Sequence, residues 1–247
     1  MRVDAVEFPE AVRRIVAWAE EGRGRTVCAA NVHMVMEAWD DPSFRAVVNG
    51  ADLVVPDGQP LVWALRLAGA PQRARVRAAP DLVLALLHEC ARRGLRAGLY
   101  GGAPDVLADL AANARRHVPG LRLVYEWSPP FRPLTAAEDE TVVGDIRAAG
   151  VQLLLVGLGC PKQERWMAAH RERLPCVMVG VGAAFDMLAG RTGNAPRWLR
   201  GAGLEWVYRL LQEPRRLWRR YLWHNPRFLV LLARETLRRR GRDGAAL

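Results

Sequence analysis

The chain has almost no lysine: Lys162 is the only one, against 35 arginines. It has four cysteines, and no two of them form a C-x-x-C pair. This spacing excludes the common zinc and thiol-redox motifs and predicts reduced thiols in a cytosolic protein. No run of about 18 uncharged apolar residues is present, so we expect no membrane-spanning helix. The first ten residues, with acids and a proline, do not resemble a signal peptide.

Three ligand-binding motifs are missing as well. No D-x-D sequence occurs, so nothing predicts a nucleotide-sugar site built on a chelated metal. No two histidines have the spacing of metal ligands, and we predict neither a metal nor a cofactor; only His33, in a loop, is placed to touch a ligand. Gly180 and Gly182 begin a G-x-G-x-x-G motif, but its third glycine position holds Phe185. Dinucleotide binding is therefore not predicted.

Charge is distributed unevenly along the chain. Residues 1–190 contain 22 basic and 22 acidic side chains, whereas residues 191–247 contain 14 arginines and four acids. The surplus of ten in this last segment equals the net charge of the whole chain. A neutral body with a cationic tail predicts a polyanionic partner. The four tryptophans of the tail favour an anionic membrane surface over nucleic acid, because indole rings settle at headgroup depth.

Short apolar segments alternate with longer segments of helical periodicity. The predicted strands are 26–30, 53–55, 97–100, 121–125, 151–156 and 177–181. The predicted helices between them are 42–49, 60–67, 80–93, 104–117, 135–149 and 161–173. This alternation predicts an α/β fold around a mainly parallel sheet. We place a catalytic body at 1–194 and a basic, tryptophan-rich appendage at 195–247, with helices over 203–223 and 226–240.

Asp57 is the strongest single candidate for chemistry. It directly follows a predicted strand, and ligands of open parallel sheets bind beyond the carboxyl ends of the strands. Gly58 beside it allows a ligand to approach closely. The Asp57 carboxylate is therefore a candidate general base. The alternative is an ordinary helix cap for the helix that begins near residue 60.

Two further segments are candidates for binding an anion. The loop at 157–164 combines two glycines, a helix start and Lys162, which together suit an anion, although a plain turn capped by Glu164 explains the same pattern. The appendage carries arginines three to four residues apart, so that several share one helical face. Guanidinium groups bind phosphate bidentately, whereas the simpler interpretation is a solvated basic face.

Taken in order, these segments resemble the WecG/TagA/CpsF family of bacterial glycosyltransferases. The matching pieces are Asn31, ADLVVPDG at 51–58, Arg75-Val76 with Asp81-Leu82, GLGCPKQERW at 157–166, GVGAAFD at 180–186 with Ala189-Gly190, Ala195-Pro196 with Trp198, GLEWVYRL at 203–210 and Glu213-Pro214-Arg215. Each piece is short, but their common order and spacing make the resemblance specific, and it covers nearly the full length.

The resemblance implies a Rossmann-like body with a C-terminal membrane-associating appendage. It implies transfer of a sugar from a UDP-sugar donor to a polyprenyl-diphosphate-linked acceptor in surface-polysaccharide biosynthesis. Family members use N-acetylmannosamine, its uronic acid or glucose, with inversion at the anomeric carbon and without a metal. The expected location is cytoplasmic, peripheral on the inner face of the cell membrane.

The resemblance also assigns roles to individual residues. Asp57 matches the proposed general base, and Gln163 matches an active-site glutamine. Arg209 and its neighbours are expected to close over the donor diphosphate. The full set of substrate-binding candidates is Asn31, Arg75, Asp81, Gly157, Gly159, Lys162, Gly182, Phe185, Asp186, Arg209, Arg215, Arg216 and Arg219.

Three positions depart from the family pattern. Ala29 replaces a threonine, the stretch at 75–81 is one residue longer and lacks its glycine, and Asn194 replaces an arginine. The alternative function is a non-catalytic Rossmann-like module whose basic tail binds anionic membrane or nucleic acid. A homo-oligomer is compatible with the sequence, which fixes no number of subunits.

We expect the appendage to dock on an anionic membrane without spanning it. Its arginines from Arg227 to Arg242 supply the charge, at about 1 kcal/mol for each basic residue near the surface. Phe228, Leu229, Leu231 and Leu232 are predicted to insert, and Trp223 is predicted to anchor at the interface.

Overall fold

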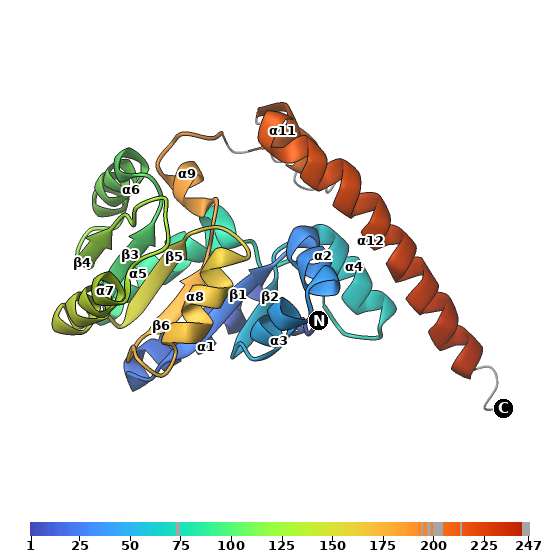
Figure 1. Cartoon of the computed structure of the whole chain (residues 1–247), viewed down its shortest axis with the longest axis horizontal. Coiled ribbons are helices and arrows are strands. Elements are labelled where there is room, and N and C mark those ends of the chain that lie inside the picture. The colour runs from blue at the N-terminus through green and yellow to red at the C-terminus, as the bar shows by residue number, and fades with distance from the viewer. Residues whose placement is uncertain (73–74, 194, 197–198, 200–204, 213, 244–247) are drawn as a thin grey trace.

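The computed structural model describes residues 1–72, 75–193, 195–196, 199, 205–212 and 214–243. Within these residues, six parallel strands form one sheet in the order β2-β1-β6-β5-β3-β4 (Figure 1). The strands are β1 (Arg25–Ala30), β2 (Leu53–Pro56), β3 (Arg96–Gly101), β4 (Arg122–Trp127), β5 (Leu153–Gly157) and β6 (Val177–Gly180). Each lies within two residues of its predicted bounds, which confirms the predicted α/β fold.

Helices cover both faces of the sheet. One face packs against α1 (Phe8–Glu21), the short π-helical turn η1 (Ala78–Leu82), α5 (Val83–Arg93), α6 (Pro104–His117) and α9 (Ala184–Leu188). The other face packs against α2 (Val32–Asp40), α3 (Pro42–Asn49), α7 (Ala136–Ala148) and α8 (Lys162–His170). A further helix, α4 (Gln59–Leu67), follows β2. The sequence did not predict α1, α2 or α9.

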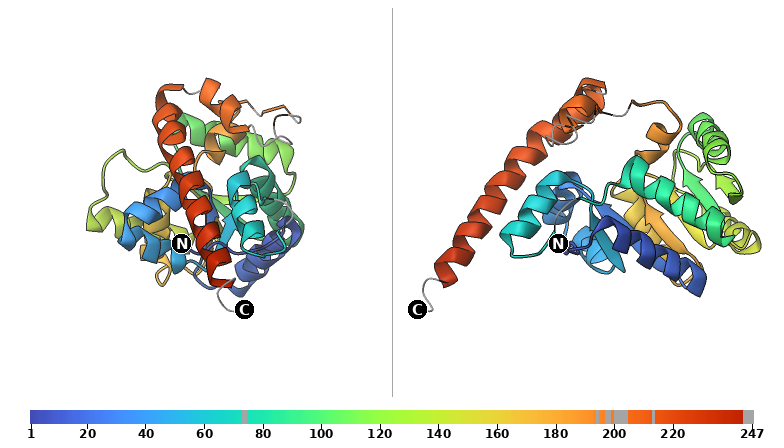
Figure 2. Two further views of the ribbon diagram at one scale, coloured as in Figure 1. Left: turned by 90° about the vertical axis from the view of Figure 1, so that its right-hand side faces the viewer. Right: turned by 180° about the vertical axis from the view of Figure 1, so that it is seen from behind.

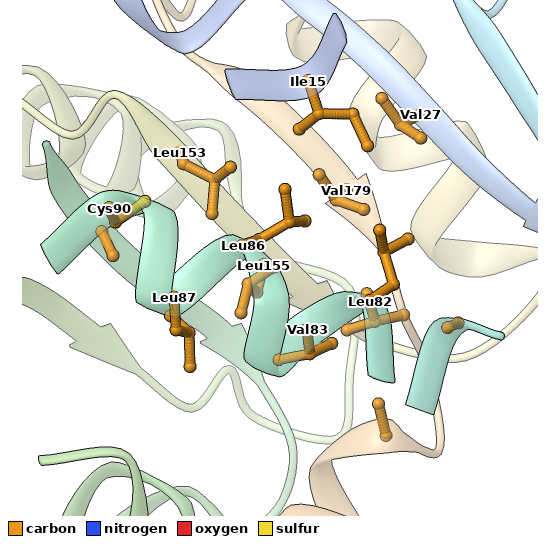
Figure 3. Packing of buried hydrophobic residues seen from close by; sticks show 14 of the residues in the cluster. Ile15, Val27, Leu82, Val83, Leu86, Leu87, Cys90, Leu153, Leu155 and Val179 are labelled. Atoms are coloured by element: carbon orange, nitrogen blue, oxygen red, sulfur yellow. The ribbon is translucent and has the colours of Figure 1, made fainter. Parts of the chain in front are cut away.

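Except in the edge strand β4, the strands are apolar at nearly all consecutive positions because both of their faces are buried. In β1, Val27 faces the first layer of helices and Cys28 faces the second, since successive side chains of a strand point to opposite faces. Figure 3 shows the first layer, where Leu82 and Leu86 pack near Val179 of β6. All three side chains are completely buried.

In the described part of the segment predicted as an appendage, the two long helices are α11 (Glu205–Gln212) and α12 (Pro214–Asp243). Figures 1 and 2 show α12 as a long helix on the side of the molecule that carries α2 and α4, with its carboxyl end directed away from the sheet. The predicted break before Pro226 is wrong, because α12 continues through this proline. An internal proline costs a helix about 3 kcal/mol. Packing offsets this cost, since the neighbouring Phe228 is buried against the body.

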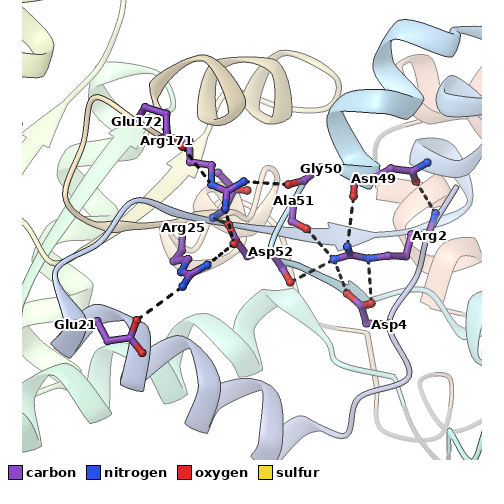
Figure 4. A network of polar contacts seen from close by, with 11 residues as sticks. Arg2, Asp4, Glu21, Arg25, Asn49, Gly50, Ala51, Asp52, Arg171 and Glu172 are labelled. Carbon is purple, nitrogen blue, oxygen red and sulfur yellow. Dashed lines mark hydrogen bonds and ion pairs between the residues drawn. The ribbon is translucent and has the colours of Figure 1, made fainter.

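A network of ion pairs holds the amino ends of β1 and β2 together (Figure 4). The Asp52 carboxylate, just before β2, accepts hydrogen bonds from Arg25 and Arg171, each at 2.8 Å, and from the Thr26 N–H at 2.9 Å. Arg2 of the N-terminal segment donates to the backbone carbonyl oxygens of Ala51 and Asp52. Four separate segments are thereby joined at this end of the sheet. No described helix is both long and apolar enough to cross a bilayer.

Candidate active site

A cavity of about 1090 Å³ lies beyond the carboxyl ends of the strands. The loops after β1, β2, β3, β5 and β6 line one side of it, and α11 and α12 line the other. The structure brings ten predicted site residues to this cavity: Asn31, Asp57, Arg75, Gly157, Gly159, Gln163, Gly182, Phe185, Asp186 and Arg209. Residues from both the body and the appendage therefore form one cavity, at the place where parallel sheets bind ligands.

Asp57 is held at the end of β2 by hydrogen bonds to its backbone and side chain. Its N–H donates to the Ala30 carbonyl at 2.8 Å, and its Oδ1 accepts from the Ala78 N–H at 2.8 Å. The loss of hydration raises the pKa of Asp57 above its ordinary value. The Ala78 hydrogen bond and the positive charges of Arg75 and Arg209 oppose this rise. The carboxyl group is thus more basic than an exposed aspartate, as a general base requires.

Two arginines of the segment before η1 pair with one glutamate of the appendage. Arg75 and Arg77 both donate to Glu205 at the start of α11, and the Arg77 contact is 3.2 Å long. Arg77 and Glu205 are buried, which strengthens the pairing relative to a surface ion pair. The charges of the two arginines lower the pKa of Glu205 against the opposing effect of its burial. This ion-pair cluster fixes α11 over the cavity.

Gln163 points into the cavity from the first turn of α8 and is buried. Its Nε2 donates to Glu164 at 2.7 Å, and among the described residues its Oε1 has no hydrogen-bond partner. Close approaches explain the glycines around it. A Cβ on Gly180 would lie 3.0 Å from Gln163 Nε2, and one on Gly157 would lie 2.7 Å from the Phe185 ring. These glycines let Gln163 and Phe185 reach their positions beside the sheet.

Three predicted site residues are not among those that line the cavity. The carboxylate of Asp81 is about half exposed and pairs with Arg77 at 3.3 Å. Lys162 is exposed at the start of α8, and Arg215 is exposed at the start of α12. The side chains of Arg216 and Arg219, and the whole of Asn194, lie outside the described residues. Among the predicted appendage arginines whose side chains the structure describes, only Arg209 lies at the cavity.

Sequence reasoning missed several lining residues. Arg77 and Glu205 received no role, because Arg77 lies in the stretch that departs from the family pattern and a glutamate in the first turn of a helix is ordinarily a surface residue. His33 lies in the first turn of α2 rather than in a loop, with Asn31 as the N-cap of that helix. His224 of α12 lies beside it. Within the sequence near His33, only its i, i+4 spacing from Glu37 indicated that side chains able to bind a metal lie together here.

Fold and cavity together define an open-sheet α/β protein that presents a carboxylate and guanidinium groups to a ligand beyond its strand ends. A sequence model of the glycosyl transferase WecG/TagA/CpsF family matches residues 1–242. The chain is 33% identical over 207 residues to the N-acetylglucosaminyldiphosphoundecaprenol N-acetyl-beta-D-mannosaminyltransferase of Bacillus spizizenii, covering 83% of this chain and 77% of that enzyme. The chain belongs to the WecG/TagA/CpsF family and is a glycosyltransferase. The non-catalytic alternative is set aside.

Proposed function

We propose that this enzyme transfers a sugar of the N-acetylmannosamine, N-acetylmannosaminuronic acid or glucose type from a UDP-sugar to a polyprenyl-diphosphate-linked saccharide, with inversion and without a metal in the reaction. The observation that carries the proposal is Asp57: a carboxyl group of raised pKa at a cavity that arginines also line. The name of the Bacillus spizizenii relative, which describes mannosaminyl transfer to a diphosphoundecaprenol-linked sugar, supports this substrate class.

The proposed reaction is a single displacement. The acceptor hydroxyl attacks the anomeric carbon of the donor, a new glycosidic C–O bond forms, and the C–O bond to UDP breaks. Asp57 takes the proton of the attacking hydroxyl, and UDP leaves with the bonding electrons. One displacement at the anomeric carbon inverts its configuration. General-base assistance of this kind contributes about 10²- to 10⁴-fold to the rate.

The leaving diphosphate needs positive charge, which arginine supplies in place of a divalent cation. Arg75, Arg77 and Arg209 line the same cavity as Asp57. Guanidinium groups match phosphate oxygens bidentately, and their fixed positions stabilise the charge that develops on the diphosphate in the transition state. Because Glu205 holds two of these arginines, the appendage helps to shape the donor site.

Exposed apolar side chains of α12 fit an anionic membrane surface. Trp218, Leu222, Trp223, Leu229 and Val230 of α12 are all about half exposed or more, and the first three also line the cavity. Trp218, Leu222 and Leu229 recur at helical spacing and share one face, and Trp223 and Val230 widen it. Exposed indole and aliphatic side chains on a cationic helix favour the interface of an anionic bilayer. Membrane attachment would bring the enzyme to its lipid-linked acceptor.

Some residues predicted to contact the membrane instead contact the body of the protein. Phe228 was expected to insert into lipid, but it is buried against the body, and Leu231 and Leu232 pack beside it. Arg227 was expected to contact lipid headgroups, but it pairs with Asp40 of α2 at 2.6 Å. An apolar run on a helix presents two faces, and the sequence does not say which of them meets the protein.

Release of UDP from a panel of UDP-sugars tests the transfer. The full-length protein, a polyprenyl-diphosphate-linked sugar acceptor and excess EDTA are combined, and a reaction without acceptor serves as the control. We expect acceptor-dependent release of UDP with at least one donor, and a product of inverted anomeric configuration. Retention of configuration, or release that requires acceptor but stops with EDTA and returns with Mg²⁺, would overturn the proposed chemistry.

Co-sedimentation with liposomes tests the membrane surface. In a double variant, Leu229→Glu with Val230→Glu, both changes fall on exposed positions that do not line the cavity, so the fold should persist. We expect binding to phosphatidylglycerol-containing liposomes to fall at least about tenfold, because apolar insertion is lost and negative charge is added. The matched control is Phe131→Glu, which changes an exposed phenylalanine between β4 and α7. Equal losses of liposome binding in the double variant and in the control would show that α12 does not form the membrane-binding surface.

A further inference from the structure

A cluster of metal-ligand side chains joins the appendage to the body. His33 and Glu37 lie one helical turn apart on α2, and His224 approaches them from α12. His33 Nδ1 lies 3.6 Å from Glu37 Oε1, and His224 Nε2 lies 4.0 Å from the same oxygen. The two imidazole rings meet edge to face, with 5.2 Å between their centroids. One ligand atom from each residue lies within 4.8 Å of the other two.

These distances suit a tetrahedral metal ion. Zinc binds imidazole nitrogen and carboxylate oxygen at about 2.0–2.2 Å, so neighbouring ligand atoms around it are about 3.4 Å apart. The spacings of 3.6 and 4.0 Å need only small side-chain rotations to reach that value. Two histidines and one glutamate form a common zinc ligand set that leaves one position for water or another ligand.

The surrounding contacts hold the two helices in register. One turn further along both helices, Arg227 of α12 pairs with Asp40 of α2. Phe228 is buried in the adjoining core. His33 and His224 retain less than a fifth of their side-chain exposure, so the cluster is shielded from solvent on several sides. The ligands are therefore brought together by the packing of the helices and do not depend on a bound ion to meet.

We propose that His33, Glu37 and His224 bind one divalent transition-metal ion of the zinc class, which fastens α12 of the appendage to α2 of the body. The ion acts on the placement of the appendage and takes no part in the transfer reaction proposed above. By mass action, it stabilises the docked arrangement, because the complete ligand set exists only when α12 lies against α2. The proposal stands on this geometry whether or not the substrate assignment is correct.

Titration with Co²⁺ tests the site, since tetrahedral Co²⁺ has a visible absorption that reports its ligands. Full-length protein without a histidine tag, first treated with chelator, is titrated with Co²⁺, followed by competition with Zn²⁺. We expect one Co²⁺ per chain, displaced by Zn²⁺. His33→Gln and His224→Gln should each weaken binding more than about 100-fold, beyond the 10–100-fold typical of altering an outer-shell partner. His88→Gln, on the exposed side of α5, should leave it unchanged.

A second measurement reports the fastening of α12 directly. Hydrogen exchange of the α12 amides should slow on addition of Zn²⁺ in the parent protein and in His88→Gln, but not in His224→Gln or Glu37→Gln. Circular dichroism of each variant verifies that it is folded, and the two histidine variants provide independent trials if one is not. Absence of Co²⁺ binding at millimolar metal, or unchanged binding in both histidine variants, would overturn the proposal. Cys160 lines the same cavity as His33 and His224. A thiolate-to-cobalt absorption band that is lost in Cys160→Ser would therefore overturn the proposed ligand set.

Discussion

Asp52 and Asp57 stand at opposite ends of the same short strand, β2, and their surroundings differ in kind. Before the strand, Asp52 receives hydrogen bonds from two arginines and a backbone N–H, and its side chain is almost fully buried. After the strand, Asp57 receives one backbone N–H and borders a large cavity. An aspartate carboxylate is therefore fully paired with donors at one end of the strand, whereas at the other end its negative charge is only partly compensated.

This difference separates stability from function along one strand. At the amino end, charges neutralise one another and join the N-terminal segment, β1, β2 and the segment after α8 (Figure 4). At the carboxyl end, dehydration raises the pKa of Asp57, so its charged form is held against an energetic cost at neutral pH. Active sites commonly retain such unfavourable groups because the chemistry requires them.

Glu205→Ala should have the largest effect, because it removes the carboxylate that two arginines share at the cavity end. Removal of this carboxylate leaves the buried Arg77 and the partly buried Arg75 without their shared partner. Breaking one side of a buried ion pair costs about 3–5 kcal/mol. Denaturant unfolding should detect this loss, together with a weaker affinity for the UDP-sugar. Glu172→Ala, at an almost fully exposed glutamate, is the control and should change stability little. Equal losses of stability in the two variants would show that the ion pairs of Glu205 have no structural role.

Gly157→Ala should disturb the cavity end through shape rather than charge. The added Cβ would lie 2.7 Å from the Phe185 ring, and overpacking of this kind costs about 1–3 kcal/mol. Turnover should fall as well, because Phe185 and Gly157 both line the cavity. Gly144→Ala in α7 is the matched control: nothing lies within 4 Å of its added Cβ. The control should gain about 0.5–1 kcal/mol in thermal or denaturant unfolding. A stabilised Gly157→Ala protein would contradict the tight packing of this loop.

The pH dependence of turnover should report the raised pKa of Asp57. A general base works only when deprotonated, so kcat/KM should fall on the acid side at a pH above the ordinary aspartate value of 3.8. The sign for stability is opposite. A carboxyl group with a raised folded-state pKa binds its proton more tightly in the folded protein, so its contribution to stability rises as pH falls through the interval above 3.8. An acid limb that persists unchanged in Asp57→Asn would assign it to another group.

The strands and the position of Asp57 could be predicted from the sequence because a local pattern determines both. Buried parallel strands are recognisable as short apolar runs, and Asp57 is recognisable from its place at a strand end. The helix α2 was missed because it begins immediately after β1, with Asn31 as its cap and no intervening turn. A helix that starts without a break leaves little signal in the sequence.

The remaining site residues depend on contacts that no local pattern contains. Glu205 meets Arg77 across 128 positions of sequence, and His224 meets His33 across 191. The fate of Phe228 was mispredicted for the same reason. Its apolar run suits a membrane or a protein core equally well, and only the position of α12 against α2 decides that this residue is buried. Tertiary packing, rather than composition, selects the buried face of the appendage.

The most direct test of this account measures turnover and thermal unfolding together in Asp52→Asn and Asp57→Asn. For Asp57→Asn we predict a loss in kcat of about a hundredfold or more, retained donor binding and a melting temperature at or above that of the parent at neutral pH, because a dehydrated charge is removed. For Asp52→Asn we predict a loss of about 1–3 kcal/mol in stability, because charge-assisted hydrogen bonds are weakened, with kcat within about threefold of the parent. A stable, fully active Asp57→Asn enzyme, or an Asp52→Asn enzyme that loses turnover without losing stability, would contradict the division of roles between the two ends of β2.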